Sequence, residues 1–396
     1  MLEFSEAQAQ LLRLAPKLGN ERLPLADLDR RFLAEGVRAP GDLPPFDYST
    51  MDGYAVAASS VGADSMRVAG ESKTGVVPGP LGRGTAMRIF TGAPIPDGAD
   101  AVIPQEDAVR DGDTVRFAKA PRVGACLRRR GDDRKAGDLV FGPGVALGPA
   151  QIALLASVDA EGATVAKLPR VTVLTTGDEL RDPGSTAFPG SIPDSNGISL
   201  ATLFGRAKAS VRIAPRVRDD ATATREAITA ALKASDVLVV VGGMSVGDHD
   251  VVRGALAAAG VDIAFWKVAI KPGKPLAVGT HPSGAIVVGL PGNPASALVT
   301  SALFVLPLLR AMQGAERPFP SPMRAPIARD FERDPGRLEF VRGVVRDGAV
   351  DPLASQASGA AWNVATASCL AVIPKDLARV AKGTPVDVYP FTELGL

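Results

Sequence analysis

Two lysines in one short loop are the clearest chemical feature of this chain. Lys271 and Lys274 flank Pro272-Gly273, and Pro275 follows directly. Two prolines stiffen the loop and so hold both ammonium groups in place. Glycine lets a backbone approach an oxyanion closely, and the lysines supply the charge that phosphates attract. A solvated connection between strands is the alternative for a lysine-rich loop, but the stiffness favours an anion site.

Two other apolar runs end in loops of the same character. The run 237–241 leads into Gly242-Gly243, and the run ending at Leu290 leads into Pro291-Gly292-Asn293-Pro294. The first loop is neither a Walker A loop nor the three-glycine dinucleotide pattern, and a glycine pair after a strand is often only a tight turn. Carboxylates follow it directly, so backbone amides could hold a phosphate while a carboxylate holds a metal or a ring nitrogen. The candidate residues of this loop are Gly242, Gly243, Ser245, Gly247, Asp248 and Asp250.

Carboxylates also follow two further strands. Glu179 comes after the run 171–176, and Asp219-Asp220 follow the run 211–217. Asp194 and Asn196 precede a helical pattern. Acids in such positions are commonly helix caps, and that reading stays open. The alternative is that they project into one crevice with the lysine loop, which predicts a site for an anionic, phosphorylated small molecule.

The elements that must position these loops alternate between strands and helices from residue 170 to 312. The strands are expected at 171–176, 211–217, 237–241 and 285–289, and the helices at 198–207, 221–234, 251–259 and 295–309. Near-continuous apolar strands are typical of buried parallel sheets. The pattern therefore predicts a doubly wound, mostly parallel α/β domain, whose ligand crevice lies at the carboxyl ends of its strands.

The rest of the chain predicts an α/β protein with additional β-rich domains. Short apolar pairs with frequent Gly and Pro indicate a β-rich insertion, and the tail returns to short strands with charged turns. Helices are expected at 5–17, 25–34 and 151–156. The predicted division is a split helical linker or dimerisation domain, a β-rich insertion, the α/β domain and a small C-terminal β-barrel-like domain, at 1–42 with 136–168, 43–135, 169–315 and 316–396.

Composition argues against several functions. Lys+Arg 44 against Asp+Glu 43 leaves a net charge of +1, so no global field recruits nucleic acid or a membrane. The most apolar run, 295–309, is expected to be a buried helix, and the N-terminus lacks the pattern of a secretory signal. Cys126 and Cys369 are in no metal-binding spacing; one disulfide is possible, but a reducing cytoplasm is favoured. The presence of only two histidines argues against a histidine-based metal centre.

Together these segments resemble the molybdopterin molybdenumtransferase family, the bacterial MoeA type shared with the gephyrin E domain. The resemblance spans nearly the whole chain. It depends on the segments discussed above and on four others, namely Pro45-Phe46-Asp47 with Met51-Asp52-Gly53-Tyr54-Ala55, Arg88-Ile89-Phe90-Thr91-Gly92-Ala93, Thr176-Gly177-Asp178-Glu179-Leu180, and Gly336-Arg337 with Phe340 and Arg342-Gly343.

The resemblance implies insertion of molybdenum from molybdate into adenylylated molybdopterin, with release of AMP and a requirement for Mg²⁺. It also implies a cytoplasmic homodimer whose active site lies between subunits, with a molybdopterin adenylyltransferase and molybdoenzyme maturation proteins as further partners. By position it assigns Asp52, Glu179 and Asp250 to catalysis, with Glu179 and Asp250 near Mg²⁺ or molybdate. The binding residues that it adds to those above are Thr91, Asp133, Arg337 and Ser358.

The chain departs from the family pattern in two places. Tyr48 and Thr50 replace the usual Asn and Ala before Met51, and the segment 359–363 after Ser358 differs from the usual small, polar run. The chemistry agrees with the residues, because carboxylic acids of raised pKa can protonate a departing oxide. Two alternatives remain: a catalytically silent pterin- or nucleotide-binding scaffold, and an adenylyltransferase or nucleotide pyrophosphatase with the same α/β domain.

Overall fold

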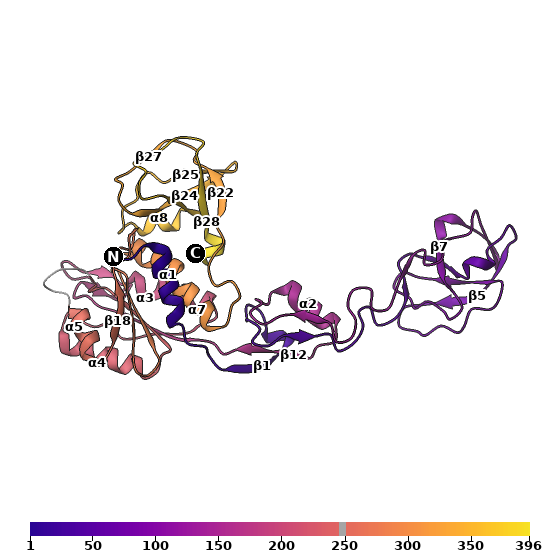
Figure 1. Ribbon diagram of the computed structural model, residues 1–396, viewed down its shortest axis with the longest axis horizontal. Helices are drawn as coiled ribbons and strands as arrows, with labels where there is room; N and C mark the ends of the chain where they lie inside the picture. The colour runs from indigo at the N-terminus through magenta and orange to yellow at the C-terminus, as the bar shows by residue number, and fades with distance from the viewer. Residues whose placement is uncertain (245–250) are drawn as a thin grey trace.

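The computed structural model describes residues 1–244 and 251–396. Figure 1 shows an elongated molecule with the α/β domain and the C-terminal domain at one end and a small β domain at the other. Between them lies a short middle region with helix α2 (Pro149–Ser157) and the antiparallel pair β1 (Asn20–Pro24) and β12 (Gly162–Ala166). Because the strands of the distal domain lie between β1 and β12 in the sequence, this domain is inserted into the middle region.

The distal domain is built on one six-stranded sheet, in the order β7-β4-β6-β5-β9-β8. Its central strands are β4 (Gly53–Val56) and β6 (Thr85–Ile89), which pair antiparallel. Around them lie β5 (Met66–Ser72), β7 (Ala101–Pro104), β8 (Ala108–Asp111) and β9 (Thr114–Phe117). Tyr54 and Val56 face one small core of this sheet, and Ala55 faces the other. The short strands and frequent turns confirm the predicted β-rich character.

The α/β domain contains the predicted parallel strands. They are β13 (Arg170–Thr175), β16 (Ser210–Ile213), β17 (Val237–Val241) and β21 (Ile286–Leu290), in the order β16-β13-β17-β21. An antiparallel extension, β20 (Ala277–Thr280) and β18 (Asp262–Trp266), completes the sheet. Helices α3 (Ser195–Arg206), α4 (Ala221–Leu232), α5 (Val251–Ala258) and α6 (Pro294–Thr300) follow the strands as expected.

The apolar run 295–309 forms part of a long buried helix, as predicted. It begins as α6, continues through a π-helical turn at Ser301–Val305, and ends as α7 (Leu306–Met312). Among the described residues, Pro294–Met312 is the one helix long and apolar enough to cross a membrane. Because 83% of the most apolar stretch of this helix is buried inside the molecule, it is a core helix here.

Two predictions about the N-terminal region need correction or refinement. The prediction of a helix at 25–34 is wrong. Only a 3-10 turn, Leu25–Asp27, forms there. Arg30 has a positive φ of 58°, which is incompatible with a continuing right-handed helix. Leu28 and Leu33 are buried by this irregular segment in the middle region. Helix α1 (Phe4–Leu14) does form, but Ala7 and Leu11 pack into the core of the α/β domain.

The C-terminal domain is a mostly antiparallel sheet in the order β19-β24-β26-β28-β22. Its strands are β22 (Met323–Pro326), β24 (Leu338–Arg346), β26 (Cys369–Ile373) and β28 (Pro385–Pro390), with β25 (Ala349–Pro352) beside β24. Its edge strand β19 (Ile270–Lys271) comes from the α/β domain and pairs parallel with β24. The lysine loop thus joins two domains. The two cysteines, Cys126 and Cys369, are both free.

Candidate active site

A cleft of about 400 Å³ lies at the carboxyl ends of the parallel strands. This is the edge at which open α/β sheets bind ligands. All six predicted segments contribute to its lining: the loops after β13, β16, β17 and β21, the segment that starts α3, and the lysine loop through Pro275. Among the predicted site residues, the cleft brings together Glu179, Asp194, Asn196, Asp219, Gly242, Gly243, Pro291, Gly292 and Asn293.

Close contacts leave no room for a side chain at either glycine of the pair that follows β17. Gly242 has φ 98°, and a Cβ there would lie 2.6 Å from the Thr176 carbonyl oxygen. Gly243 has φ 58°, and a Cβ there would lie 2.3 Å from a methyl carbon of Val252. The Gly292 backbone lies against Gly242, because a Cβ at Gly292 would be 3.6 Å from the Gly242 Cα. The three loops therefore meet with bare backbone at the floor of the cleft, which suits an anion.

Like Asp219, Glu179 is an acid of the cleft whose carboxylate has no partner among the described residues. Its side chain is exposed and folds back over Gly177, where a Cβ would lie 2.5 Å from Glu179 Oε2. Within the described residues no hydrogen bond or ion pair holds its carboxylate. The neighbouring Asp178 differs: it accepts a hydrogen bond from the Arg218 guanidinium at 3.0 Å, and this contact lowers the pKa of Asp178. Asp219 also lines the cleft, so it and Glu179 are the two lining carboxylates that cap no helix, and Asp194 is the third.

The next acids along the chain act as helix caps. Asp194 Oδ1 accepts from the Gly197 N–H at 3.0 Å, and its Oδ2 accepts from Thr175 Oγ1 at 2.7 Å, so this buried carboxylate begins α3. Asp220 accepts from the Ala223 N–H at 2.7 Å and begins α4, outside the cleft. The capping alternative therefore describes both residues.

Asn196 combines a structural contact with a free acceptor. Its Nδ2 donates to the Gly292 carbonyl oxygen at 2.7 Å, which ties α3 to the loop after β21. Its Oδ1 is buried and has no hydrogen-bond partner among the described residues. Thr176 Oγ1, beside the glycine pair, is unpartnered in the same way. Buried polar atoms are normally paired, so these two atoms are candidates for contacts with a ligand.

Asp52 and Thr91 meet in the distal domain, far along the molecule from the cleft. Asp52 Oδ1 accepts two hydrogen bonds from Thr91, from its N–H and from its Oγ1, both at 2.8 Å. The backbone bond is the larger cause of a lowered pKa at Asp52, followed by the hydroxyl bond. In the single chain two donors thus stabilise the ionised carboxylate of Asp52, so Asp52 is not one of the acids of raised pKa that the chemistry calls for. Neither residue lines the cleft that contains Glu179, and within one chain the distal domain lies at the opposite end of the molecule from the α/β domain (Figure 1).

Asp133 lies where the distal domain rejoins the middle region. It pairs with Arg128, while Arg129 pairs with Asp47 at 2.9 Å and Arg130 with Asp42 at 2.5 Å. The basic run 128–130 is thus ion-paired with acids on both chain segments that connect the distal domain to the middle region. Such exposed pairs contribute little stability individually.

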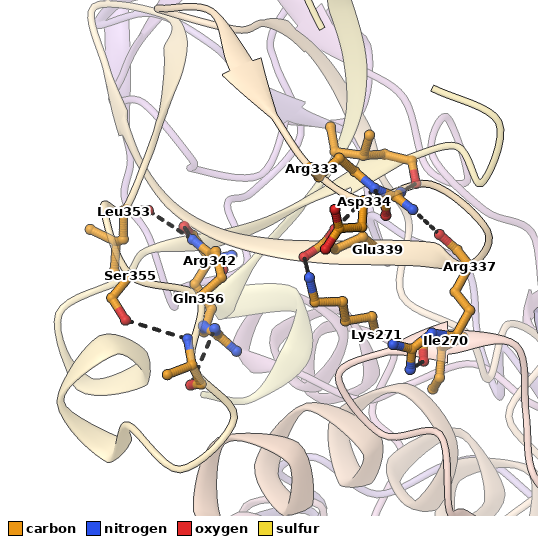
Figure 2. Close-up of polar contacts among 12 residues, drawn as sticks. Ile270, Lys271, Arg333, Asp334, Arg337, Glu339, Arg342, Leu353, Ser355 and Gln356 are labelled. Atoms are coloured by element: carbon orange, nitrogen blue, oxygen red, sulfur yellow. Dashed lines mark hydrogen bonds and ion pairs between the residues drawn. The ribbon is translucent and has the colours of Figure 1, made fainter. Parts of the chain in front are cut away.

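The lysine loop lies at the joint between the α/β and C-terminal domains, as Figure 2 shows. Lys271 Nζ lies 3.1 Å from Glu339 Oε1, and Lys271 lines a second cleft with Arg333 and Gln356. Lys274 is exposed, and no residue in the described ranges pairs with its ammonium group. The loop backs onto the long helix at Gly273, where a Cβ would lie 2.1 Å from Thr300 Cγ2. Pro275, at its end, lines the first cleft, so the loop borders both.

Arg337 and Ser358 contact these loops from the C-terminal domain. Arg337 Nη1 donates to the Ile270 carbonyl oxygen at 3.2 Å, and Arg337 is therefore a contact of the lysine strand. Ser358 Oγ accepts from Asn293 Nδ2 at 3.0 Å, and its carbonyl oxygen accepts from the Ala295 N–H at 3.2 Å. Ser358 thus lies against the loop that follows β21, despite the unusual segment after it.

Arg342 and Glu339 were not predicted as site residues, although Arg342 belongs to a segment that carries the family resemblance. Arg342 is 0% exposed, and its Nε and Nη1 have no partners within the described ranges. Its Nη2 makes one long contact, 3.5 Å, to the Ala357 carbonyl oxygen. Burial lowers the pKa of Arg342, and the Glu339 charge opposes that shift. The sequence does contain a signal for Arg342, namely a charged residue within the strand Leu338–Arg346. A cation that is buried in a strand needs a partner, which marks it as a candidate for a ligand contact.

Several predicted residues fall outside the described residues. They are Ser245, Gly247, Asp248 and Asp250. Within the described ranges, no group of three or more His, Cys, Asp or Glu side chains could hold a metal ion. The two cleft carboxylates, Glu179 and Asp219, nevertheless fit the way proteins bind Mg²⁺, through one or two carboxylates together with substrate phosphates.

Comparisons with known proteins cover the whole chain. Three family profiles match in order: "MoeA N-terminal region (domain I and II)" at residues 2–158, "Probable molybdopterin binding domain" at 172–311, and "MoeA C-terminal region (domain IV)" at 324–391. The chain is 34% identical to a molybdopterin molybdenumtransferase of Haemophilus influenzae over 100% of both chains. It is also 34% identical to the protein of that name from Nostoc sp., over 95% of this chain and 91% of the relative.

Solved structures agree over the same span. A molybdopterin biosynthesis MoeA protein from Pyrococcus horikoshii has a TM-score of 0.82 at 30% identity, and the match covers 99% of each chain. A second structure of a MoeA protein from this organism has a TM-score of 0.85 at 26% identity, covering 98% of this chain and 100% of the other. The elongated arrangement in Figure 1 is thus shared with experimentally determined structures.

Proposed function

The chain belongs to the molybdopterin molybdenumtransferase family, and we propose that it acts in molybdenum cofactor biosynthesis by inserting molybdenum from molybdate into adenylylated molybdopterin. AMP is released and molybdenum-loaded molybdopterin is formed. The observation that carries this proposal is the cleft at the strand ends, where bare glycine backbone and two uncapped carboxylates, Glu179 and Asp219, lie together. This combination suits a ligand with both anionic and hydrogen-bonding groups.

The cleft residues divide the work between binding and proton transfer. The N–H groups around Gly242 and Gly243 and the free Asn196 Oδ1 contact the substrate's phosphate and polar ring groups. Glu179, exposed and unpaired among the described residues, transfers protons to the oxygen that leaves molybdate when the dithiolene sulfurs replace it. Asp250 and Asp248, outside the described residues, are proposed to complete the acidic part of this site.

The lysine loop, which lies between the cleft and the C-terminal domain, also binds oxyanions. Lys274 presents an ammonium group that no described residue pairs with, and Lys271 reaches the joint with the C-terminal domain. The buried Arg342 guanidinium adds two nitrogens, Nε and Nη1, that have no partner among the described residues. Charge-assisted hydrogen bonds from such groups are the strong ones, so we assign these groups to molybdate or a substrate phosphate.

Magnesium is part of the proposal, as a partner of the substrate's phosphates. Glu179 and Asp219 would hold it, with Asp250 as a further candidate. When bound, it would screen the pyrophosphate charge and polarise the phosphoanhydride. Dialysis against a chelator followed by addition of Mg²⁺ tests this part separately, because molybdate-dependent AMP release should be lost and then restored.

The active form is proposed to be a cytoplasmic homodimer. Asp52 and Thr91 lie far from the cleft of their own chain, so their catalytic role requires the distal domain of a second subunit to reach it. Exposed apolar residues near Asp52, namely Met51 at 41% and Phe46 at 44% exposure, are consistent with a face that another chain covers. A molybdopterin adenylyltransferase and molybdoenzyme maturation proteins are the proposed further partners.

The decisive experiment measures AMP release from adenylylated molybdopterin with and without molybdate. A molybdenumtransferase should release AMP in a molybdate-dependent way and give a molybdenum-containing product. Molybdate-independent AMP release would identify a pyrophosphatase instead. Binding without any AMP release would identify a silent scaffold.

A further inference from the structure

The carboxylate of Glu339 joins the lysine loop to the C-terminal domain (Figure 2). Its side chain is 3% exposed, and it contacts two cations from opposite sides. Oε1 lies 3.1 Å from Lys271 Nζ, and Oε2 lies 3.1 Å from Arg333 Nε. The second contact is an ion pair without a hydrogen bond, because Arg333 Nε donates to the Asp334 carbonyl oxygen at 3.0 Å. The strands carrying Glu339 and Lys271 pair in register, β24 with β19, so the lysine contact is fixed by backbone pairing.

The two cations differ in their freedom to bind anything else. The Arg333 side chain is 2% exposed and is held further by the Arg337 carbonyl oxygen at 2.7 Å from its Nη2. The Lys271 side chain is 36% exposed. An incoming anion can therefore reach Lys271, whereas Arg333 is committed to Glu339 and to the backbone.

The cleft around this cluster is balanced in charge. Three cations and three carboxylates line it, namely Lys271, Arg333 and Arg379 with Glu332, Asp334 and Glu339. Arg379 has its own carboxylate partner, Asp330, outside the lining. Of the three carboxylates only Glu339 is buried, so its interactions are screened least by water. An anion that binds Lys271 must compete with this carboxylate.

We propose that Glu339 is an internal counter-ion that positions Lys271 and weakens the binding of oxyanions to it, so that Glu339 sets the anion affinity of the lysine loop. This inference rests on the proposed function, in which Lys271 binds molybdate or a substrate phosphate. Glu339 is a positioning residue here, because it acts through Lys271 and touches no substrate. Its carboxylate keeps the ammonium group oriented and excludes weakly held anions from it.

The test is a calorimetric titration of the full-length chain with molybdate, sulfate and phosphate as probes. Glu339→Gln keeps the side-chain shape but removes the charge, so at least one of these anions should bind about tenfold more tightly. The melting temperature of this variant should be low without anions and should rise more steeply with anion concentration than that of the wild type. A residue with only a structural role would lower the melting temperature without increasing the affinity for anions.

Two further variants keep the test decisive. Asp351→Asn removes an equivalent charge from an exposed pair with Arg329, outside the cleft, and should leave anion affinity unchanged. Glu339→Asp keeps the negative charge but shortens the side chain by one methylene, so the carboxylate lies farther from Lys271. Anions should bind this variant more tightly than the wild type, but less tightly than Glu339→Gln. If Glu339→Gln stays unfolded at all anion concentrations, Glu339→Asp decides the matter: affinity equal to or below that of the wild type overturns the inference.

Failure of this inference is distinguishable from failure of the proposed function. If Lys271→Ala weakens anion binding and Glu339→Gln does not strengthen it, only the counter-ion role is wrong. If Lys271→Ala leaves binding of all three anions unchanged, the lysine loop itself is not the anion site. The double variant Lys271→Ala/Glu339→Gln should lose the gain in affinity that the single Glu339→Gln change produces.

Discussion

The acids of the α/β cleft and of the distal Asp52 loop differ in how firmly neighbouring groups hold their carboxylates. In the cleft, Glu179 is exposed and unpaired among the described residues, beside loops that meet through bare backbone. In the distal domain, Asp52 is fixed by two hydrogen bonds from Thr91 and its pKa is lowered. The domains that carry the two acids lie at opposite ends of the elongated chain (Figure 1).

This difference indicates a division of roles. A carboxylate that no neighbour holds can change its protonation state and exchange protons with a substrate. A carboxylate stabilised by two donors stays ionised and is better suited to accept hydrogen bonds or attract a cation. We therefore propose that protons are transferred in the cleft, and that the distal loop is a hydrogen-bond acceptor that a second subunit delivers to it.

The largest expected effect is on Glu179. Glu179→Ala should lower molybdate-dependent AMP release by roughly 10²–10⁴-fold, the range for loss of a general acid or base. The melting temperature should stay near that of the wild type, because the residue is exposed and its carboxylate supports no fold contact among the described residues. Asp178→Ala is the matched control: it removes the adjacent acid, which pairs with Arg218, and should leave turnover largely intact. Equal losses in both variants would contradict the special role of Glu179.

Mixing two inactive variants tests whether the two regions meet between chains. Asp52→Ala and Glu179→Ala homodimers should each be inactive, because every site lacks one acid. After both are unfolded and refolded together, random pairing makes about half of the dimers mixed, each with one complete site, so about a quarter of wild-type activity should return. Wild-type protein taken through the same refolding is the control. A mixture that stays inactive while the wild type recovers would place the whole site within one chain.

The cleft was the more predictable of the two regions. Near-continuous apolar runs at 237–241 and 285–289 predicted buried parallel strands, and the loops that follow such strands necessarily share one edge. That edge is where Glu179, Gly242 and Asn293 lie. The capping alternative was also stated correctly for Asp194 and Asp220, whose side chains bond the first turns of α3 and α4.

The distal loop and the domain joint were less predictable because their contacts are between segments distant in sequence. Nothing in the spacing around Asp52 indicates that Thr91 would fix it, since 39 residues separate them. The pairing of β19 with β24 likewise joins Lys271 to Glu339 across two domains. The expected helix at 25–34 failed because its leucines are buried by an irregular segment in which Arg30 has a positive φ.

A smaller effect should separate the lysine loop from the acidic cleft. Lys274→Ala removes an ammonium group that no described residue pairs with, and loss of one charge-assisted contact costs about 1.5–3 kcal/mol. Apparent affinity for molybdate or for the adenylylated pterin should therefore fall roughly tenfold or more, with a smaller change in turnover at saturation. Lys382→Ala, in a turn of the C-terminal domain outside both clefts, is a suitable control. Unchanged titration curves for both ligands would remove Lys274 from the site.

The smallest expected effect is on the acid stability of the distal domain. Because the folded pKa of Asp52 is lowered, its contribution to stability is fully present above the unfolded value, 3.8, and is lost as the pH falls through the lower folded value. Thr91→Ala removes the hydroxyl donor but keeps the backbone donor, which is the larger cause of the lowered pKa. The Asp52 pKa should then rise only part of the way toward 3.8, as an NMR titration of the side-chain carboxyl would measure. A full return to 3.8 would mean that the hydroxyl alone fixes Asp52, and an unchanged pKa would mean that the backbone N–H alone does. Either result would change how firmly the distal acid is held before its proposed delivery to the cleft by a second subunit.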